Sequence, residues 1–474
     1  MKENYIIWLK SKYNGKNGTI SSYTKALENL STSIKYNIFE NTNLLVLDKL
    51  YKDLLQNQKD KNGIYFNKDS SSYGEKGFYS ASLRTYIDFL KSNNSPKNTI
   101  ELNINHLQTS YIQSGLTYTN ELITRYISSL VTKPFVLLSG LSGSGKTMLS
   151  LSFSKWICAN KTQYCIVPVG ADWTNREPLL GYVNALSNEE YIKPENGALE
   201  LLINANKEEN QNKPYFLILD EMNLSHVERY FADFLSIMES KDKFKLHSDT
   251  VNEKSGVPHE LDWPKNLFVV GTVNIDETTY MFSPKVLDRA NVIEFRVNES
   301  EIESFLNNPN EIDFTQLETN GASMEASFVQ MAKNKEFEAV NTDNLNKTLV
   351  KFFAELKKTG AEFGYRTGME IHRLYNQIST VNTDISENDK IDIAVIQKLL
   401  PKLHGSRRKL HPILEVLATL CVKATVDVKK DFLENKEELI FKENTDVLYP
   451  LSLEKITRMY KGAIDNGFAS YAEA

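Results

Sequence analysis

The chain has few cysteines and lacks any long apolar run. Its 474 residues include only three cysteines, Cys158, Cys165 and Cys421, and none of them belongs to a CxxC pair. This usage argues against a disulfide framework and against a zinc site built from paired cysteines. No uninterrupted apolar segment approaches the length of a membrane span, and residues 1–5 do not lead into a signal-peptide core. We therefore expect a cytoplasmic protein without a membrane segment.

The size and charge of the chain suggest several domains of unequal character. A chain of 474 residues exceeds what one hydrophobic core supports, so two to four domains are expected. The net charge of −6 is unevenly spread, because residues 1–95 hold fourteen Lys and Arg against nine Asp and Glu. A basic N-terminal segment suits contact with nucleic acid. It equally suits a lysine-rich surface that merely solvates a small helical domain, and both interpretations stay open.

Hydrophobic periodicity divides the chain into four parts. Residues 1–92 predict a small α-helical domain, since leucines such as Leu47 and Leu54 recur at helical spacing. Residues 93–112 are predicted to be a linker. Residues 113–298 alternate between strand and helix patterns, which predicts an α/β core with a parallel sheet, and residues 299–474 predict a helical lid and C-terminal region. The expected core strands are residues 135–139, 164–169, 215–219, 267–273 and 292–295.

A glycine-rich segment directly follows the apolar residues 135–138. It has the spacing G-x-x-x-x-G-K-T of a phosphate-binding P-loop. The glycines let backbone N–H groups converge on phosphate oxygens, beside the positive end of the following helix. Lys146 is expected to reach the β- and γ-phosphates, and the Thr147 hydroxyl is expected to ligate Mg²⁺. The segment predicts that a nucleoside triphosphate is bound by Gly140, Ser142, Gly143, Ser144, Gly145, Lys146 and Thr147.

Two acids end another apolar run. Residues 215–219 lead into Asp220 and Glu221, so both carboxylates are expected at the C-terminal edge of a buried strand, where α/β sheets bind ligands. Asp220 is expected to hold Mg²⁺, and Glu221 to orient or deprotonate the attacking water. Paired acids at a strand end are common by themselves. Downstream of a P-loop, they predict a Walker B motif.

Three further residues are candidates for phosphate contact. Asn274 ends the third apolar run and is a candidate sensor of the γ-phosphate or the lytic water, or else a turn-forming Asn. Arg289 precedes the last predicted strand and is a candidate finger for a neighbouring subunit's γ-phosphate, or else a surface ion-pair partner. Arg366 stands at a predicted helix start, where it resembles a sensor 2 arginine that contacts phosphate in cis. Pairing with Glu370 on the same helix face is the alternative.

The order of these motifs resembles that of the AAA+ ATPases: a P-loop, a strand ending in Asp-Glu, a strand ending in Asn, an Arg before the next strand, and a helical lid. Within that fold, the chain from about residue 115 onward resembles the GTPase subunit of McrBC-type, modification-dependent restriction systems. The passages that carry this second resemblance are Val169-Gly170-Ala171-Asp172-Trp173-Thr174, Asp220-Glu221-Met222-Asn223-Leu224, Gly271-Thr272-Val273-Asn274-Ile275-Asp276-Glu277 and Leu403-His404-Gly405-Ser406-Arg407-Arg408-Lys409-Leu410.

The resemblance implies a Mg²⁺-dependent NTPase that forms a homo-oligomeric, hexameric ring and drives a separate McrC-like nuclease of the PD-(D/E)xK type. It also implies DNA as a partner, for which residues 1–92 are the candidate module; they distantly resemble the helical DNA-clasping domains of tyrosine recombinases. One passage departs from the family. The founding McrB proteins carry Met-Asn-Thr-Ala-Asp-Arg, whereas here Asp276 and Glu277 stand two and three places after Asn274. The preferred base therefore stays open between GTP and ATP.

The sequence offers no convincing nuclease centre of its own. The one local look-alike, Asp427 with Glu434 and Lys436, lies in a charged segment that predicts helix, which is the wrong context for two acids and a lysine around Mg²⁺. A rival interpretation of the same motifs is a MoxR-like AAA+ chaperone. In that case residues 1–92 would dock a protein client and bind no DNA. A regulatory nucleotide switch without motor output is the third possibility.

Overall fold

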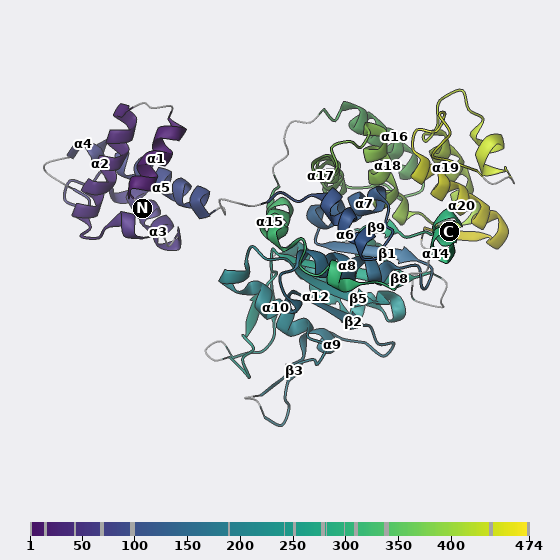
Figure 1. The fold of residues 1–474 in the computed structure, drawn as a ribbon, viewed down its shortest axis with the longest axis horizontal. Helices are drawn as coiled ribbons and strands as arrows, with labels where there is room; N and C mark the ends of the chain where they lie inside the picture. The colour runs from purple at the N-terminus through teal and green to yellow at the C-terminus, as the bar shows by residue number, and fades with distance from the viewer. Residues whose placement is uncertain are drawn as a thin grey trace. The chain divides into compact units, whose positions relative to one another are not determined.

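The chain forms two compact units, Met1–Thr99 and Ile100–Ala474, and each has its own hydrophobic core (Figure 1). Each unit is described by itself below. The computed structural model describes residues 2–13, 17–41, 44–66, 71–94, 100–187, 190–240, 242–249, 253–275, 280, 282–297, 299–307, 311–335, 341–435 and 439–471.

The N-terminal unit is a small helical domain, as its leucine spacing predicted. Leu47 and Leu54 of the predicted helical pattern are fully buried. The centre of the core is aromatic, because the ring of Tyr5 packs edge-on against Tyr86 at 5.2 Å and lies 5.3 Å from Phe89. Its helices are α1 (Lys2–Lys12), α2 (Asn17–Ser33), α3 (Leu44–Asn57), α4 (Ser71–Glu75) and α5 (Phe78–Asn94).

The second unit is built on a five-stranded parallel sheet, which confirms the predicted α/β class. Each predicted strand agrees with the structure to within one residue at either end. In spatial order the strands are β2 (Tyr164–Pro168), β5 (Tyr215–Asp220), β8 (Leu267–Asn274), β1 (Phe135–Gly140) and β9 (Asn291–Glu294). Because all strands run the same way, with Gly140 paired to Asn274 and Pro168 paired to Asp220, the polar residues that end them meet at one edge of the sheet.

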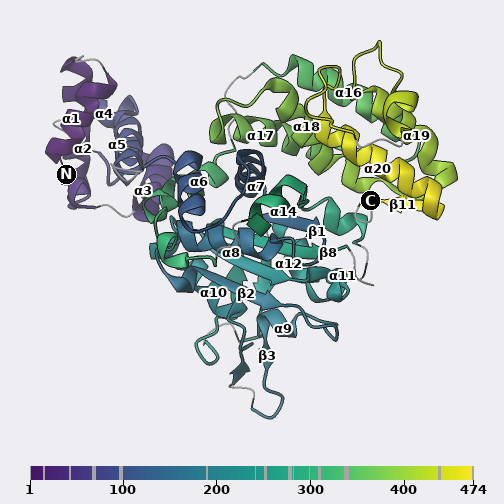
Figure 2. The ribbon, with the colours of Figure 1, turned by 45° about the vertical axis from the view of Figure 1, so that its right-hand side comes forward.

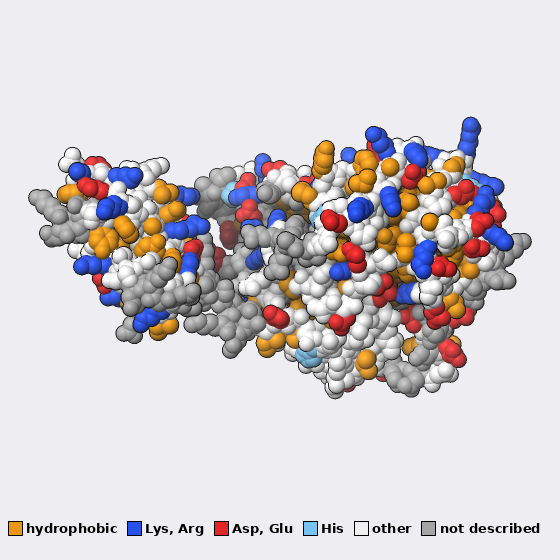
Figure 3. Space-filling model, turned by 90° about the horizontal axis from the view of Figure 1, so that it is seen from above, with side chains coloured by type: hydrophobic (Ala, Val, Ile, Leu, Met, Phe, Trp, Pro, Cys, Tyr) orange, Lys and Arg blue, Asp and Glu red, His pale blue; other side chains and the backbone are white. Residues whose placement is uncertain are grey.

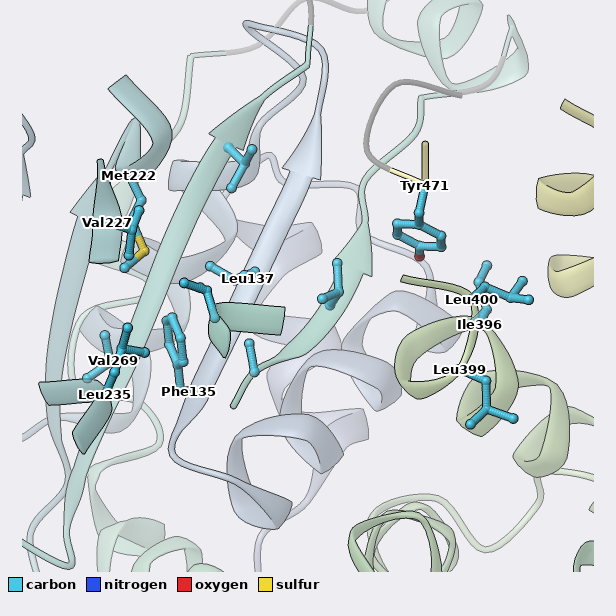
Figure 4. Packing of buried hydrophobic residues seen from close by; sticks show 14 of the residues in the cluster. Phe135, Leu137, Met222, Val227, Leu235, Val269, Ile396, Leu399, Leu400 and Tyr471 are labelled. Carbon is cyan, nitrogen blue, oxygen red and sulfur yellow. The ribbon is translucent and has the colours of Figure 1, made fainter. Parts of the chain in front are cut away.

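Successive side chains of the central strands point to opposite faces of the sheet and pack into two separate hydrophobic layers. Val136 and Leu138 of β1 pack under α7 and α8, whereas Phe135 and Leu137 point to the opposite face. Figure 4 shows Phe135 and Leu137 on the same side of the sheet as Met222. The helices of this α/β region are α7 (Asn120–Thr132), α8 (Lys146–Ile157), α9 (Glu177–Leu180), α10 (Ala198–Asn206), α11 (Val227–Tyr230), α12 (Ala232–Ser240), α13 (Pro284–Leu287) and α14 (Glu299–Asn307).

The C-terminal part of this unit is mainly helical, as predicted. Helices α16 to α20 gather along one side of the α/β core (Figure 2). The helices are α15 (Glu325–Lys333), α16 (Asp343–Lys357), α17 (Tyr365–Val381), α18 (Glu387–Lys398), α19 (Arg407–Thr419) and α20 (Pro450–Asn466). Within the described residues, none of the helices is long and apolar enough to cross a membrane.

Three short antiparallel strand pairs in the described residues have no counterpart in the predicted pattern. Each strand is only two or three residues long, so no alternation of apolar and polar residues marks it in the sequence. The pairs are β3 (Tyr182–Val183) with β4 (Tyr191–Ile192), β6 (Lys243–Lys245) with β7 (Glu260–Asp262), and β10 (His404–Ser406) with β11 (Phe468–Ser470).

The predicted linker, residues 93–112, differs from the structure in its C-terminal half. Helix α6 (Ile104–Gln113) occupies that half and belongs to the second unit. Asn103 caps the helix by accepting hydrogen bonds from two backbone N–H groups, and Leu107 and Tyr111 are buried against α7 and α8. A helix this short has only a few apolar positions, so its sequence does not show a helical repeat that separates it from a linker.

A buried ion-pair cluster joins strand β9 to helix α20. The Glu294 carboxylate accepts hydrogen bonds from Lys455 Nζ at 3.0 Å and from Arg458 at 2.7 and 2.8 Å. Burial raises the pKa of Glu294, but the hydrogen bonds and charges of Arg458 and Lys455 outweigh it and lower the pKa to about 2. The cluster therefore fixes the C-terminal helix to the edge of the sheet.

Replacing Glu294 by Gln is expected to lower the free energy of unfolding by about 3–5 kcal/mol, because Lys455 then stays buried without a carboxylate. Urea unfolding of the two proteins measures the change. The difference should be largest above pH 4.5 and shrink as the pH falls toward 2, since the carboxylate's contribution is lost by protonation over that range. The exposed pair Lys423–Asp446 is the control, and Asp446→Asn should cost less than about 1 kcal/mol. If both substitutions lower the free energy of unfolding by the same small amount, the Glu294 cluster does not stabilise the fold as stated.

Candidate functional site

The P-loop connects the end of β1 to the start of α8. Gly145 has a φ of +96° and directly precedes the first residue of the helix, a conformation that glycine adopts without strain. At Gly140 a Cβ atom would lie 2.3 Å from the Phe295 carbonyl oxygen, so the close approach of strand and loop also requires glycine. Ser142, Gly143 and Ser144 form the exposed to half-buried turn between them. The backbone N–H groups at the N-terminus of α8 therefore point into the loop, where an anion can accept hydrogen bonds from them.

Lys146 is the first residue of α8, and its side chain folds back over the loop. Its Nζ donates hydrogen bonds to the carbonyl oxygens of Gly140 at 3.0 Å and Leu141 at 2.5 Å. The residue is only 4% exposed, which is unusual for a lysine. A buried ammonium at this position is suited to neutralise the phosphate charge of a nucleotide.

The Asp220 carboxylate joins the P-loop helix to the two neighbouring strands. The Thr147 hydroxyl, in the first turn of α8, donates to Asp220 Oδ1 at 2.6 Å. The Thr272 hydroxyl, on β8, donates to the same oxygen at 2.8 Å. In turn, the backbone N–H of Glu221 donates to the Thr272 hydroxyl at 3.0 Å. One carboxylate therefore sets the relative positions of P-loop, Walker B strand and sensor strand.

Glu221 and Asn274 lie together beside Asp220. Asn274 Nδ2 donates to Glu221 Oε1 at 3.1 Å, and Asn223 Nδ2 donates to the Asn274 carbonyl oxygen at 3.0 Å. Glu221 has a φ of +53°, a conformation that costs a residue other than glycine about 1 kcal/mol or more. Such strain is common where a side chain must be aimed at a ligand. The acid and the amide that the sequence placed 53 residues apart thus form one hydrogen-bonded pair.

The residues at this edge fit a magnesium ion bound together with phosphate. Thr147 Oγ1 and Asp220 Oδ1 are hard oxygen ligands 2.6 Å apart, and Mg²⁺ is typically held by one or two carboxylates plus substrate phosphates and water. Among the described residues, no three His, Cys, Asp or Glu side chains are grouped so as to hold a metal by themselves. A metal at this site would therefore depend on oxygens from the nucleotide.

The two candidate arginines meet at a single carboxylate, that of Glu239 on α12. Arg289 Nη2 donates to Glu239 Oε2 at 2.7 Å, and Arg366 Nη1 donates to Glu239 Oε1. Arg289 also donates from Nε to the Leu235 carbonyl oxygen at 2.9 Å. Arg366 Nε lies 4.0 Å from Glu370, so the alternative pairing predicted for it is present, although Glu239 is the nearer partner. Phosphate contact by either arginine stays a prediction.

Two groups of residues named in the sequence analysis remain, and some of their members lie outside the described residues. Asp276 and Glu277, where the chain departs from the McrB pattern, lie outside the described residues, and so does Lys436. Asp427 and Glu434 of the nuclease look-alike are both exposed.

Reasoning from the sequence missed three residues that contact the site. The Thr272 hydroxyl bonds to the Asp220 carboxylate and to the Glu221 N–H, and Asn223 bonds to the backbone carbonyl oxygen of Asn274. Tyr118 lies beside the P-loop, with its hydroxyl 3.5 Å from the Gly145 carbonyl oxygen and its ring edge-on to Phe295. Burial raises the pKa of Tyr118, so the phenol stays protonated. A polar Thr inside the otherwise apolar run 267–273 was the one signal available for Thr272.

Thr272→Val is expected to lower nucleotide turnover roughly 10–100-fold, which corresponds to the loss of a hydrogen bond to a charged group. Nucleotide affinity should change little, because Lys146 and the loop are untouched. Steady-state hydrolysis and equilibrium binding separate the two quantities. Thr272→Ser retains the hydroxyl and should keep near-normal turnover. Normal turnover in Thr272→Val would show that Thr272 does not orient the acids.

Comparisons with known proteins match parts of the chain. Residues 299–468 match the model of a domain of unknown function, DUF8727. No curated protein matches the chain. Among solved structures, the chain is similar to a candidate ATPase from Cytophaga hutchinsonii, with 16% identity and a TM-score of 0.44 over 62% of this chain and 86% of the other.

Proposed function

We propose that this protein hydrolyses GTP or ATP at the interfaces of a homo-oligomeric, hexameric ring. The observation that carries the proposal is the convergence of polar groups at one edge of the parallel sheet, where Thr147 of the P-loop donates to Asp220 and Asn274, the last residue of β8, donates to Glu221. These groups come from segments up to 127 residues apart in the chain. They supply the cradle, metal ligands and water-orienting acid that phosphoryl transfer requires.

Each residue has a distinct role in this proposal. Lys146 neutralises charge on the β- and γ-phosphates, and the N-terminus of α8 adds its positive dipole end. A magnesium ion held by Thr147 and Asp220 would neutralise phosphate charge during transfer. Glu221 orients or deprotonates the attacking water, and Asn274 holds the Glu221 carboxylate in place at 3.1 Å.

Arg289 is proposed to act on the nucleotide of the neighbouring protomer. Its side chain is 20% exposed, and the residue lies between α13 and the edge strand β9. A guanidinium fork stabilises the charge that develops on the transferring phosphoryl group, which accounts for large rate factors in other NTPases.

The biological setting that we propose is an McrBC-like restriction or anti-phage system with a separate PD-(D/E)xK nuclease subunit. The motif passages quoted above and the basic N-terminal unit support it. Figure 3 shows Lys and Arg side chains spread over the visible face of that unit, with few acidic ones among them. Residues 1–92 would contact DNA, and the nucleotide cycle would drive the nuclease. The rival assignment, a MoxR-like chaperone, shares the nucleotide chemistry and differs in the partner.

Mixing two inactive variants tests the trans arrangement. Glu221→Gln and Arg289→Ala should each reduce turnover at least about 100-fold. An equal mixture should recover about a quarter of wild-type turnover, because random assembly places an intact finger beside an intact acid at one interface in four. Hydrolysis of GTP and of ATP is measured for each sample. If the mixture never exceeds either variant, or Arg289→Ala hydrolyses normally, Arg289 is not a finger in trans.

A gel shift distinguishes the two settings. Residues 1–99 have their own hydrophobic core and are expected to fold alone. They should retard duplex DNA at low salt, and the affinity should fall steeply as salt is raised, because Lys and Arg contacts release counterions. Residues 100–474 serve as the acidic control. Absence of binding to modified and plain DNA at low salt, by the fragment and by the full chain, would favour the chaperone.

A further inference from the structure

The short connection that carries Arg289 is held on both sides by buried lysines. Lys133, which follows α7, donates from Nζ to the Asp288 carbonyl oxygen at 3.0 Å. Lys398, the last residue of α18, donates from Nζ to the Ala290 carbonyl oxygen at 3.1 Å. The backbone carbonyls immediately before and after Arg289 are thus each fixed by an ammonium group. Neither lysine belongs to the P-loop, the Walker B strand or the sensor strand.

A single carboxylate ties the two lysines together. Glu370 of α17 accepts from Lys133 at 2.6 Å through Oε1 and from Lys398 at 2.7 Å through Oε2. The side chains of Lys398, Lys133 and Glu370 are 3%, 13% and 17% exposed. We refer to Lys133, Glu370 and Lys398 as the clamp. Glu370 was expected to pair with Arg366, and that guanidinium lies farther from it, at 4.0 Å.

Burying the charged groups of the clamp costs folding free energy. Burial lowers the pKa of Lys133 and of Lys398, and the Glu370 carboxylate opposes this in both cases. Two buried ammonium groups share the Glu370 carboxylate, and the other negative groups near them are the backbone carbonyls of Asp288 and Ala290 and the Asp288 carboxylate, which Lys402 approaches at 2.6 Å. Apolar residues of similar volume generally stabilise a fold as well as such a cluster or better. What the cluster adds over apolar packing is a fixed geometry, because each hydrogen bond sets a direction as well as a distance.

We propose that the clamp is a positioning device for Arg289, through which the helices of the C-terminal region set the orientation of the finger presented to the next protomer. The inference rests on the proposed action of Arg289 in trans. Lys398 of α18 contacts the connection between α13 and β9 directly, and Glu370 of α17 acts on it through the two lysines that it binds. A shift of α18 on the core would therefore pull on the main chain after Arg289, and a shift of α17 would move both lysines through Glu370. The P-loop and the acids of the same protomer are not part of this connection.

The test is a complementation experiment with the full-length chain. Lys398→Met keeps the length of the side chain and removes its charge. Alone, it should lower kcat at least about tenfold, with KM changed less than about twofold, since the nucleotide site of that protomer is intact. Mixed with Glu221→Gln, it should recover turnover, because the intact finger of Glu221→Gln then serves the intact site of Lys398→Met. Combined with Arg289→Ala in one chain, it should lower turnover no further than Arg289→Ala alone.

Lys390→Met is the matched control. Lys390 is on the same helix, donates to Ser379 Oγ at 3.1 Å and lies over the ring of Tyr375, so its loss should leave turnover unchanged. If Lys398→Met does not fold, as judged by thermal unfolding, Glu370→Gln replaces it and the same outcomes apply.

The outcomes separate the two proposals. If turnover recovers when Glu221→Gln is mixed with Arg289→Ala but not when it is mixed with Lys398→Met, the clamp is overturned and the proposed role of Arg289 remains. Wild-type turnover in Lys398→Met would also overturn the clamp. Failure of Arg289→Ala itself to recover would overturn the proposed function, and the clamp with it.

Discussion

The hydrogen bonds accepted by Asp220 are the constraint on which the rest of the site depends. Its Oδ1 accepts from Thr147 at 2.6 Å and from Thr272 at 2.8 Å, so a single oxygen joins α8, β5 and β8. The parallel sheet makes this possible, since it brings the carboxyl ends of these strands to one edge. Glu221 and Asn274 then acquire their positions from the same framework, through the Thr272 hydroxyl and the pairing of β8 with β1. The proposed binding of a triphosphate and the proposed orientation of water by Glu221 therefore depend on one geometry.

A second network of charged groups holds the connection around Arg289. Glu239 of α12 accepts from Arg289, and Lys133, which follows α7, and Lys398 of α18 donate to the main chain on either side of it. Most of these groups are far apart in the chain, and α18 belongs to the region that matches DUF8727. In the proposed ring, this region would influence hydrolysis by setting the position of Arg289. This gives the helical region a physical role in the proposed ring.

Local patterns predicted the strands, and the positions of Gly140 and Asp220 at the ends of two of them, because each depends on consecutive residues. An apolar run followed by Gly140 or Asp220 carries its own boundary, and the observed strands end within one residue of the expected positions. Contacts made across the fold had no such signal. Arg366 and Glu239 are 127 residues apart in the chain and still form an ion pair. Glu370 binds the buried Lys133 and Lys398 more closely than Arg366, its neighbour on the same helix. Thr272 was overlooked for the same reason, since a threonine within a buried strand has no pattern that reveals its partner.

The central claim is that Lys146, Thr147 and Asp220 bind a magnesium nucleoside triphosphate. Isothermal titration of the full chain with the slowly hydrolysed analogues GTPγS and ATPγS, with and without Mg²⁺, tests it most directly. We expect one site per chain for at least one analogue, tighter binding with Mg²⁺, and a loss of at least about tenfold in affinity, or about 1.4 kcal/mol, in Lys146→Ala. Absence of binding of either analogue to the wild-type chain, or equal affinity in Lys146→Ala, would contradict it.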